Sequence, residues 1–152
     1  MASRRSPRAI PPVTIWTREF AAVPEQVGQA RRLLADALGN CPAAGDALLC
    51  LSELAGNSVL HSASRRPGGA FTVRAEIRQG DYVRIEVRDE GGAWNERPGP
   101  DLHAHGLAIV RALADESGVD GDALTGWIAW ARLPWPGRAV VSETQHSRAG
   151  RV

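Results

Sequence analysis

Residues 51–62 read LSELAGNSVLHS and combine two patterns in one segment. The leucines and the valine recur at helical spacing and predict a helix over residues 43–62 with one apolar face. Glu53, Asn57 and His61 follow at intervals of four residues, and four residues advance a helix by about 400°. These three side chains therefore form a polar stripe that borders the apolar face. A solvated helix surface, with His61 near the helix end, explains the stripe as well as a binding site does.

The segments around this helix predict an α+β fold. Apolar and charged residues alternate in two strands on either side of Gly80-Asp81, which is typical of a hairpin with one buried face. The chain order predicts a two-layer α/β sandwich, with helices on one face of a mixed, mostly antiparallel sheet. The other predicted elements are a strand at 13–21, a helix at 24–38, a helix at 105–116 and two closing strands within 117–135.

Length and charge limit the classes of function. The 152 residues predict one domain at 13–136, between flexible tails at 1–12 and 137–152. All 18 basic residues are arginine, and outside the tails 12 basic residues face 16 acidic ones, a net charge of −4. This balance argues against nucleic-acid binding. No apolar run is long enough for a membrane span, and the arginine-rich start lacks the apolar segment of a signal peptide, so we expect a cytoplasmic protein.

The cysteines and histidines give little sign of metal chemistry. Cys41 and Cys50 lie nine residues apart without a C-x-x-C pattern, and Cys50 falls within the apolar helix, so we expect a reduced, buried thiol. His103 and His105 have too few neighbouring ligands for a metal site.

Asp89 breaks the pattern of its strand. Counting by twos from Val83 through Ile85 and Val87, the next residue on the core-facing side is Asp89. A carboxylate at the end of an apolar face needs a partner or a ligand, because burying an unpaired charge is unfavourable. Alternatively, the strand ends at Arg88 and Asp89 begins a turn.

A long connection follows this strand. Residues 91–106 read GGAWNERPGPDLHAHG, and connections of this length in compact domains are typical of lids and binding loops. Gly106 stands at the predicted start of the next helix, where free backbone amides favour phosphate. A plain helix start is the alternative.

Together these features resemble a known family. The N box LSELAGNSVLHS, the first glycine box VRDEGGAW and the second box HAHGLAIVRALAD are similar to those of the Bergerat-fold GHKL ATPases, which include gyrase and histidine kinases. Within that superfamily, the short layout resembles the anti-sigma factor serine kinases. The terminal TGWIAWARL resembles the last box and strand, and the likeness covers roughly residues 13–135.

The resemblance implies roles for individual residues. Asp89 would accept a hydrogen bond from the adenine amino group of ATP, and Gly91 would let the backbone pass close to the base. Asn57 would bind Mg²⁺ through its side-chain oxygen. Glu53 would be the general base that takes a proton from the attacking hydroxyl.

Further positions follow from the same resemblance. Gly106 and Leu107 would present amides to the phosphates, Thr125 would help at the adenine end, and Arg97 in the lid is a candidate phosphate contact. Two positions depart from the family pattern: Ala104 replaces a glycine of the second box, and Leu124 precedes Thr125 where a lysine is frequent. These departures affect phosphate affinity or lid closure and leave Glu53, Asn57 and Asp89 unchanged. For His61 we expect a structural role.

The resulting hypothesis is an ATP-binding regulator of the anti-sigma type. It would phosphorylate a serine or threonine of a small anti-sigma-factor antagonist, bind a sigma factor, and possess no nucleic-acid or membrane partner; a homodimer is compatible with the family. An ATP-binding switch without kinase activity is the main alternative. The catalytic domain of a histidine kinase ranks lower, because residues before 13 offer no helix for a phosphoacceptor histidine, and a structural domain without nucleotide ranks last.

Overall fold

The structure, a computed structural model, describes residues 9–92 and 102–136. Its elements follow the predicted order closely, and the strand at 13–21 and the helix at 24–38 have the predicted bounds. The elements are β1 (Val13–Ala21), α1 (Pro24–Leu38), α2 (Ala44–His61), the short 3-10 helix η1 (Ala63–Arg65), β2 (Ala70–Arg78), β3 (Tyr82–Arg88), α3 (Leu102–Leu113), β4 (Glu116–Asp122) and β5 (Gly126–Pro134).

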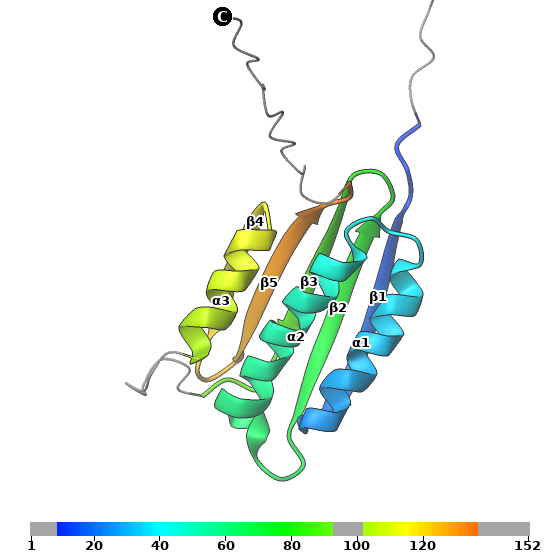
Figure 1. The fold of residues 1–152 in the computed structure, drawn as a ribbon. Coiled ribbons are helices and arrows are strands. Elements are labelled where there is room, and N and C mark those ends of the chain that lie inside the picture. Colours follow the sequence, from blue (N-terminus) through cyan, green and yellow to red (C-terminus); the bar gives the residue numbers. More distant parts are fainter. Residues whose placement is uncertain (1–8, 93–101, 137–152) are drawn as a thin grey trace, which may run out of the picture.

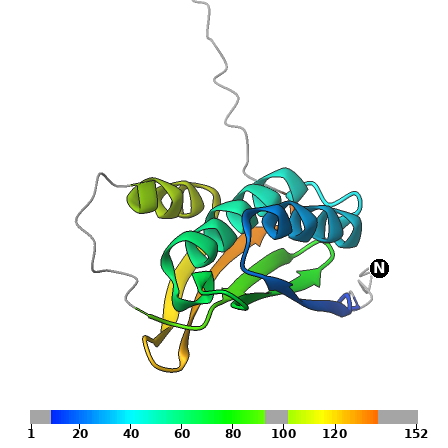
Figure 2. The ribbon, with the colours of Figure 1, turned by 90° about the horizontal axis from the view of Figure 1, so that it is seen from below.

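The five strands form one sheet in the order β1-β2-β3-β5-β4. All pairings between these strands are antiparallel. The three α-helices cover one face of the sheet, and no described helix covers the other face (Figure 1, Figure 2). The predicted two-layer α+β sandwich is therefore confirmed, with a sheet that is antiparallel throughout its described strands.

The core lies between the sheet and the helices. β2 and β3 bury every second residue, as their alternating sequences predict, and Phe71 and Ile85 are fully enclosed. α2 is the central helix and contributes Leu51 and Leu54 to this core. Both cysteines are free and buried, which confirms the prediction made for Cys50.

The bounds of α3 and the hydropathy of the helices can be compared with the sequence predictions. α3 begins at Leu102, three residues before the predicted position 105, and ends at Leu113. No helix within residues 9–92 and 102–136 is long and apolar enough to cross a bilayer. The predicted flexible tails lie largely outside the described residues, as does Arg97 in the predicted lid.

Candidate functional site

The polar stripe of α2 lies where this helix borders α3 and the end of β3. Asn57 is buried, with 7% of its surface exposed, and Glu53 one turn earlier is half-buried. The solvated-surface explanation therefore does not hold for Asn57. The side chain of His61 lies outside the described part of the structure, so its structural role stays a prediction.

Asp89 lies directly after β3 and is buried, with 5% of its surface exposed. Its Oδ1 accepts hydrogen bonds from the backbone N–H of Gly91 at 2.8 Å and of Trp127 at 3.2 Å. Its own N–H donates to the carbonyl of Trp127 at 3.0 Å. The strand ends at Arg88, as in the alternative interpretation in which Asp89 begins a turn. The Asp89 side chain nevertheless points to the protein interior. Backbone donors on one oxygen orient this carboxylate.

Ser58 connects Asp89 to the N-box helix. Ser58 is 1% exposed, and its hydroxyl lies 3.4 Å from both Asp89 Oδ2 and the Leu54 carbonyl oxygen. The two carboxylate oxygens of Asp89 therefore have different surroundings, because backbone amides contact Oδ1 and a helix hydroxyl faces Oδ2.

Two glycines allow the backbone to close tightly around Asp89. Gly91 has φ +86°, and a β-carbon there would lie 2.4 Å from the Ala123 carbonyl oxygen. Gly126 has φ +110°, and a β-carbon there would lie 2.4 Å from the Asp89 carbonyl oxygen. Only glycine adopts these conformations without strain and leaves room for the opposing carbonyls.

The turn after β3 is also tied to the end of α2. The Ala63 N–H donates to the Gly91 carbonyl at 2.7 Å, and the Glu90 N–H donates to Ser64 Oγ at 2.9 Å. Trp127 Nε1 donates to the Gly92 carbonyl at 2.8 Å. These bonds fix the two glycine-rich segments and the N-box helix relative to one another.

Glu53 is brought together with Gly106 of α3. A β-carbon added at Gly106 would lie 2.6 Å from Glu53 Oε2. Because α3 begins at Leu102, Gly106 lies in its second turn and not at the helix start that the sequence suggested. The first four amides of a helix are those without helical partners, so the phosphate role of Gly106 and Leu107 stays a prediction. The structure adds that Gly106 makes space for the Glu53 carboxylate.

Thr125 occupies the turn between β4 and β5 and is exposed. Its hydroxyl donates to Asp122 Oδ1 at 2.9 Å, and its backbone N–H donates to the same oxygen at 2.7 Å. These bonds lower the pKa of Asp122. Thr125 and Asp89 both line a shallow cavity of about 250 Å³. The hydrogen bond to the Asp89 carboxylate comes instead from the N–H of Trp127 at the start of β5.

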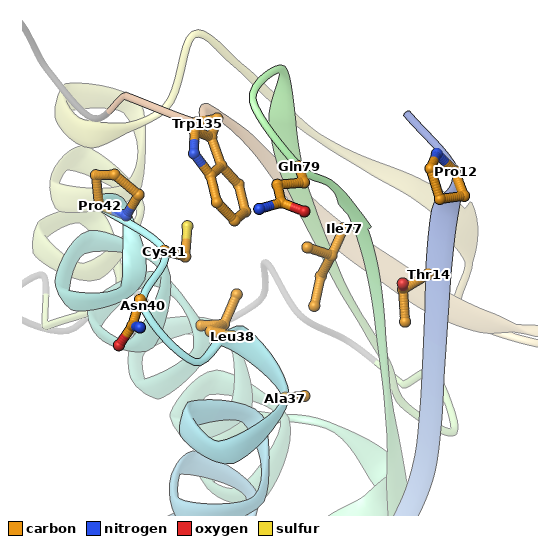
Figure 3. Close-up of a pocket in the computed structure, with 10 residues that line it drawn as sticks. All are labelled: Pro12, Thr14, Ala37, Leu38, Asn40, Cys41, Pro42, Ile77, Gln79 and Trp135. Carbon is orange, nitrogen blue, oxygen red and sulfur yellow. The ribbon is translucent and has the colours of Figure 1, made fainter. Parts of the chain in front are cut away.

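A second cavity, of about 560 Å³, lies at the other end of the molecule (Figure 3). It is bounded by the connection between α1 and α2 and by the ends of β2 and β5, with Leu38, Ile77 and Trp135 among its lining residues. None of the predicted site residues lines it. The residues that carry the candidate chemistry gather instead around the second half of α2.

The residues of the site suit a magnesium–nucleotide complex. Asp89 is a buried, oriented acceptor of the kind that an adenine amino group requires. Within residues 9–92 and 102–136, no group of three histidine, cysteine or acidic side chains gathers into a metal site. Mg²⁺ bound with ATP needs few protein ligands, because water and phosphate oxygens complete its shell. The side-chain oxygen of Asn57 is a suitable ligand.

Comparison with known families decides the wider class. The family model described as a histidine kinase-like ATPase domain matches residues 20–128. The chain belongs to this family. Membership supports an ATP-binding regulatory protein of the GHKL superfamily, and the fold agrees with that assignment. No curated protein matches the chain.

Several residues of the histidine kinase-like site were not found by sequence reasoning. Ser58, Ser64, Gly92 and Trp127 contribute hydrogen bonds or close packing around Asp89. Ser58 gave one usable signal, since a serine on the buried side of an apolar helix needs a partner. Trp127 gave no such signal, because its hydrogen-bond partners, the Asp89 carboxylate and the Gly92 carbonyl, lie 38 and 35 positions away in sequence.

Proposed function

We propose that this protein is a Mg²⁺-dependent serine/threonine kinase that acts on a small anti-sigma-factor antagonist in the cytoplasm. The observation that supports it is the position of Glu53. Its carboxylate lies against Gly106 at the junction of α2 and α3, one turn from the buried Asn57. A module that only binds ATP has no need for a carboxylate at this place.

The phosphotransfer needs little from the protein besides positioning and one base. Asp89 and the backbone around Gly91 would hold the adenine, and Asn57 would hold the metal end of the nucleotide. Bound Mg²⁺ supplies neutralisation of the phosphate charge. Glu53 would take the proton of the substrate hydroxyl while the oxygen of that hydroxyl forms a bond to the γ-phosphorus. The bond from the γ-phosphorus to the β–γ bridging oxygen breaks, and ADP leaves.

A switch module without kinase activity is the second candidate. It is supported by the departures at Ala104 and Leu124, which by the family resemblance affect phosphate affinity or lid closure. Such a protein would bind ATP and a sigma factor or antagonist, and release one of them when the nucleotide changes.

The decisive experiment incubates the full chain with Mg²⁺ and γ-labelled ATP together with purified candidate antagonists. We expect acid-stable label on a serine or threonine of the antagonist. Glu53→Ala should abolish this label while ATP binding, measured by calorimetry, is retained. The matched control is Glu25→Ala, an exposed glutamate in the first turn of α1.

Three outcomes separate the candidates. Label that depends on Glu53 supports the kinase. Intact ATP binding without any phosphotransfer supports the switch module. Acid-labile label on a histidine would instead point to histidine-kinase chemistry.

A further inference from the structure

Trp127 lies on the helix-covered side of the sheet but outside the hydrophobic core. In β5 the alternate residues Ala129, Ala131 and Leu133 are buried, so this series of positions faces the helices. Trp127 continues the series, yet it is only half-buried and does not belong to the buried core. A large aromatic ring that is only partly covered at such a position has surface available for a ligand.

Trp127 and Asp89 are direct neighbours on β5 and β3, two strands that lie side by side (Figure 1). Arg88 pairs with Ile128 in this antiparallel register, so the next pair in register is Asp89 with Trp127. The N–H of Asp89 donates to the Trp127 carbonyl at 3.0 Å, and the N–H of Trp127 donates to Asp89 Oδ1 at 3.2 Å. Residues that stand opposite each other in this way place their β-carbons about 4.5–5.5 Å apart on the same face of the sheet.

A hydrogen bond fixes the orientation of the Trp127 indole. Its Nε1 donates to the Gly92 carbonyl at 2.8 Å. The Gly91-Gly92 segment is itself held on two sides, because the Ala63 N–H donates to the Gly91 carbonyl and the Gly92 N–H donates to the Ala123 carbonyl. The ring is therefore positioned before any nucleotide binds, so that binding does not require the ring to be ordered first.

We propose that Trp127 forms one wall of the base site, with its indole ring against the flat face of the adenine of ATP. The inference rests on the proposed function, in which Asp89 accepts a hydrogen bond from the adenine amino group. A base held by Asp89 lies within reach of a side chain whose β-carbon is about 5 Å from that of Asp89. Ligand sites combine aromatic walls with a few polar groups that set the orientation of the ligand. Trp127 and Asp89 supply these two parts.

The two residues act on different properties of the nucleotide. Every nucleobase has a flat π face, so contact with the indole raises the affinity for any base. The Asp89 carboxylate distinguishes an amino group from a carbonyl group at the edge of the base, because only the amino group donates a hydrogen bond. Trp127 therefore contributes affinity for the nucleotide, and Asp89 contributes selectivity for adenine.

A purely structural role for Trp127 is the competing explanation. The indole would then serve only to hold the Gly92 carbonyl, and loss of its N–H would be the damaging change. Phenylalanine at position 127 keeps an aromatic ring and lacks the N–H, whereas leucine lacks both. Comparison of these two substitutions therefore separates the effect of the ring from the effect of the hydrogen bond.

The test measures the affinity of the full chain for ATP with Mg²⁺, by calorimetry, in Trp127→Leu and Trp127→Phe. We expect the Kd to rise about tenfold or more in Trp127→Leu, as for one lost base–aromatic contact, and to stay within about threefold of the natural chain in Trp127→Phe. Trp130→Leu is the matched control, because Trp130 lies on the same strand but its ring faces Arg84 on the open side of the sheet. Its ATP affinity should equal that of the natural chain.

Tryptophan fluorescence gives a second measurement that does not depend on the folding of Trp127→Leu. A purine in contact with an indole quenches the emission of that indole, so ATP should decrease the emission of the natural chain. Trp127→Phe should lose most of this decrease while it still binds ATP. Trp130→Phe should retain the decrease.

Three results would overturn the inference. These are equal ATP affinities of Trp127→Leu and the natural chain, equal losses of affinity in Trp127→Leu and Trp127→Phe, and an ATP-dependent decrease in emission that persists in full in Trp127→Phe. ATP binding without phosphotransfer would refute the kinase alone, because the contact with the base does not require the reaction. Absence of ATP binding to the natural chain would refute the proposed function and this inference together.

Discussion

Gly106 on α3 lies so close to Glu53 on α2 that a β-carbon at position 106 would fall 2.6 Å from Glu53 Oε2. The contact joins two elements of the candidate site that are 53 positions apart in the sequence. Because the opposing atom is the end of a flexible side chain, a methyl group there would displace the carboxylate and leave the helices in place. A substitution at Gly106 can therefore test the position of the Glu53 carboxylate without disturbing the fold.

Gly106→Ala should lower phosphotransfer strongly while the protein stays folded and binds ATP. Displacing a general base by about 1 Å lowers turnover on the order of 100-fold. Alanine also favours the helix over glycine by up to about 1 kcal/mol, so the melting temperature should not fall much. Gly45→Ala is the control, since it lies in α2 with nothing within 4 Å of the added carbon. Unchanged turnover in Gly106→Ala would mean that the position of Glu53 is unimportant.

Asp89→Asn should remove nucleotide binding. Asn keeps the shape of the side chain but replaces one acceptor oxygen with an NH₂ group. That group would face either the amides of Gly91 and Trp127 or the adenine amino group, and both are donors. We expect the Kd for ATP to rise on the order of 100-fold, measured by calorimetry. Asp36→Asn, at an exposed position of α1, serves as the control; micromolar ATP binding by Asp89→Asn would refute the adenine role.

Ser58→Ala should weaken ATP binding moderately. The change removes the hydroxyl that faces Asp89 Oδ2, and the loss of one such hydrogen bond, about 1 kcal/mol, corresponds to roughly a fivefold rise in Kd. Ser52→Ala removes a comparable hydroxyl of α2, which bonds the Leu48 carbonyl at 3.0 Å and does not contact Asp89. Equal affinities for the two variants would show that Ser58 does not orient the carboxylate.

Gly126→Ala should destabilise the protein much more than Gly80→Ala. Both glycines have positive φ, so each substitution costs about 1 kcal/mol or more in backbone strain. At Gly80 the added carbon meets nothing within 4 Å, whereas at Gly126 it meets the Asp89 carbonyl oxygen at 2.4 Å. Chemical denaturation measures the difference in the free energy of unfolding. Similar values for the two variants would mean that the turn can move away from Asp89.

The buried thiols predict a pH dependence of stability. Burial, with smaller contributions from Asp46 and Glu53, raises the pKa of Cys50 from 9.0 to about 12. The folded state therefore keeps a proton that the unfolded state loses, and the free energy of unfolding should fall as the pH rises from 9 toward 12. Cys50→Ala should make this decline shallower when unfolding is followed across that range. A decline of the same slope in both proteins would place the titration elsewhere.

Local sequence patterns were sufficient for most of the fold. Alternation in β2 and β3 predicted both strands and their buried faces, because neighbouring residues of a strand point to opposite sides. The start of α3 was predicted at residue 105 and lies at Leu102. Residues 101–106, DLHAHG, contain no apolar residues at regular helical spacing. The sequence therefore did not indicate that the helix begins before residue 105.

For the site, the amino-acid pattern alone was enough to single out three residues. Glu53, Asn57 and Asp89 stood out because a carboxylate or amide beside an apolar pattern requires a partner. Their arrangement is visible only in the folded protein, where Ser58 faces Asp89 and Gly106 makes room for Glu53. Such contacts join segments far apart in the chain, and their distances depend on how strands and helices pack, which no local pattern of residues records.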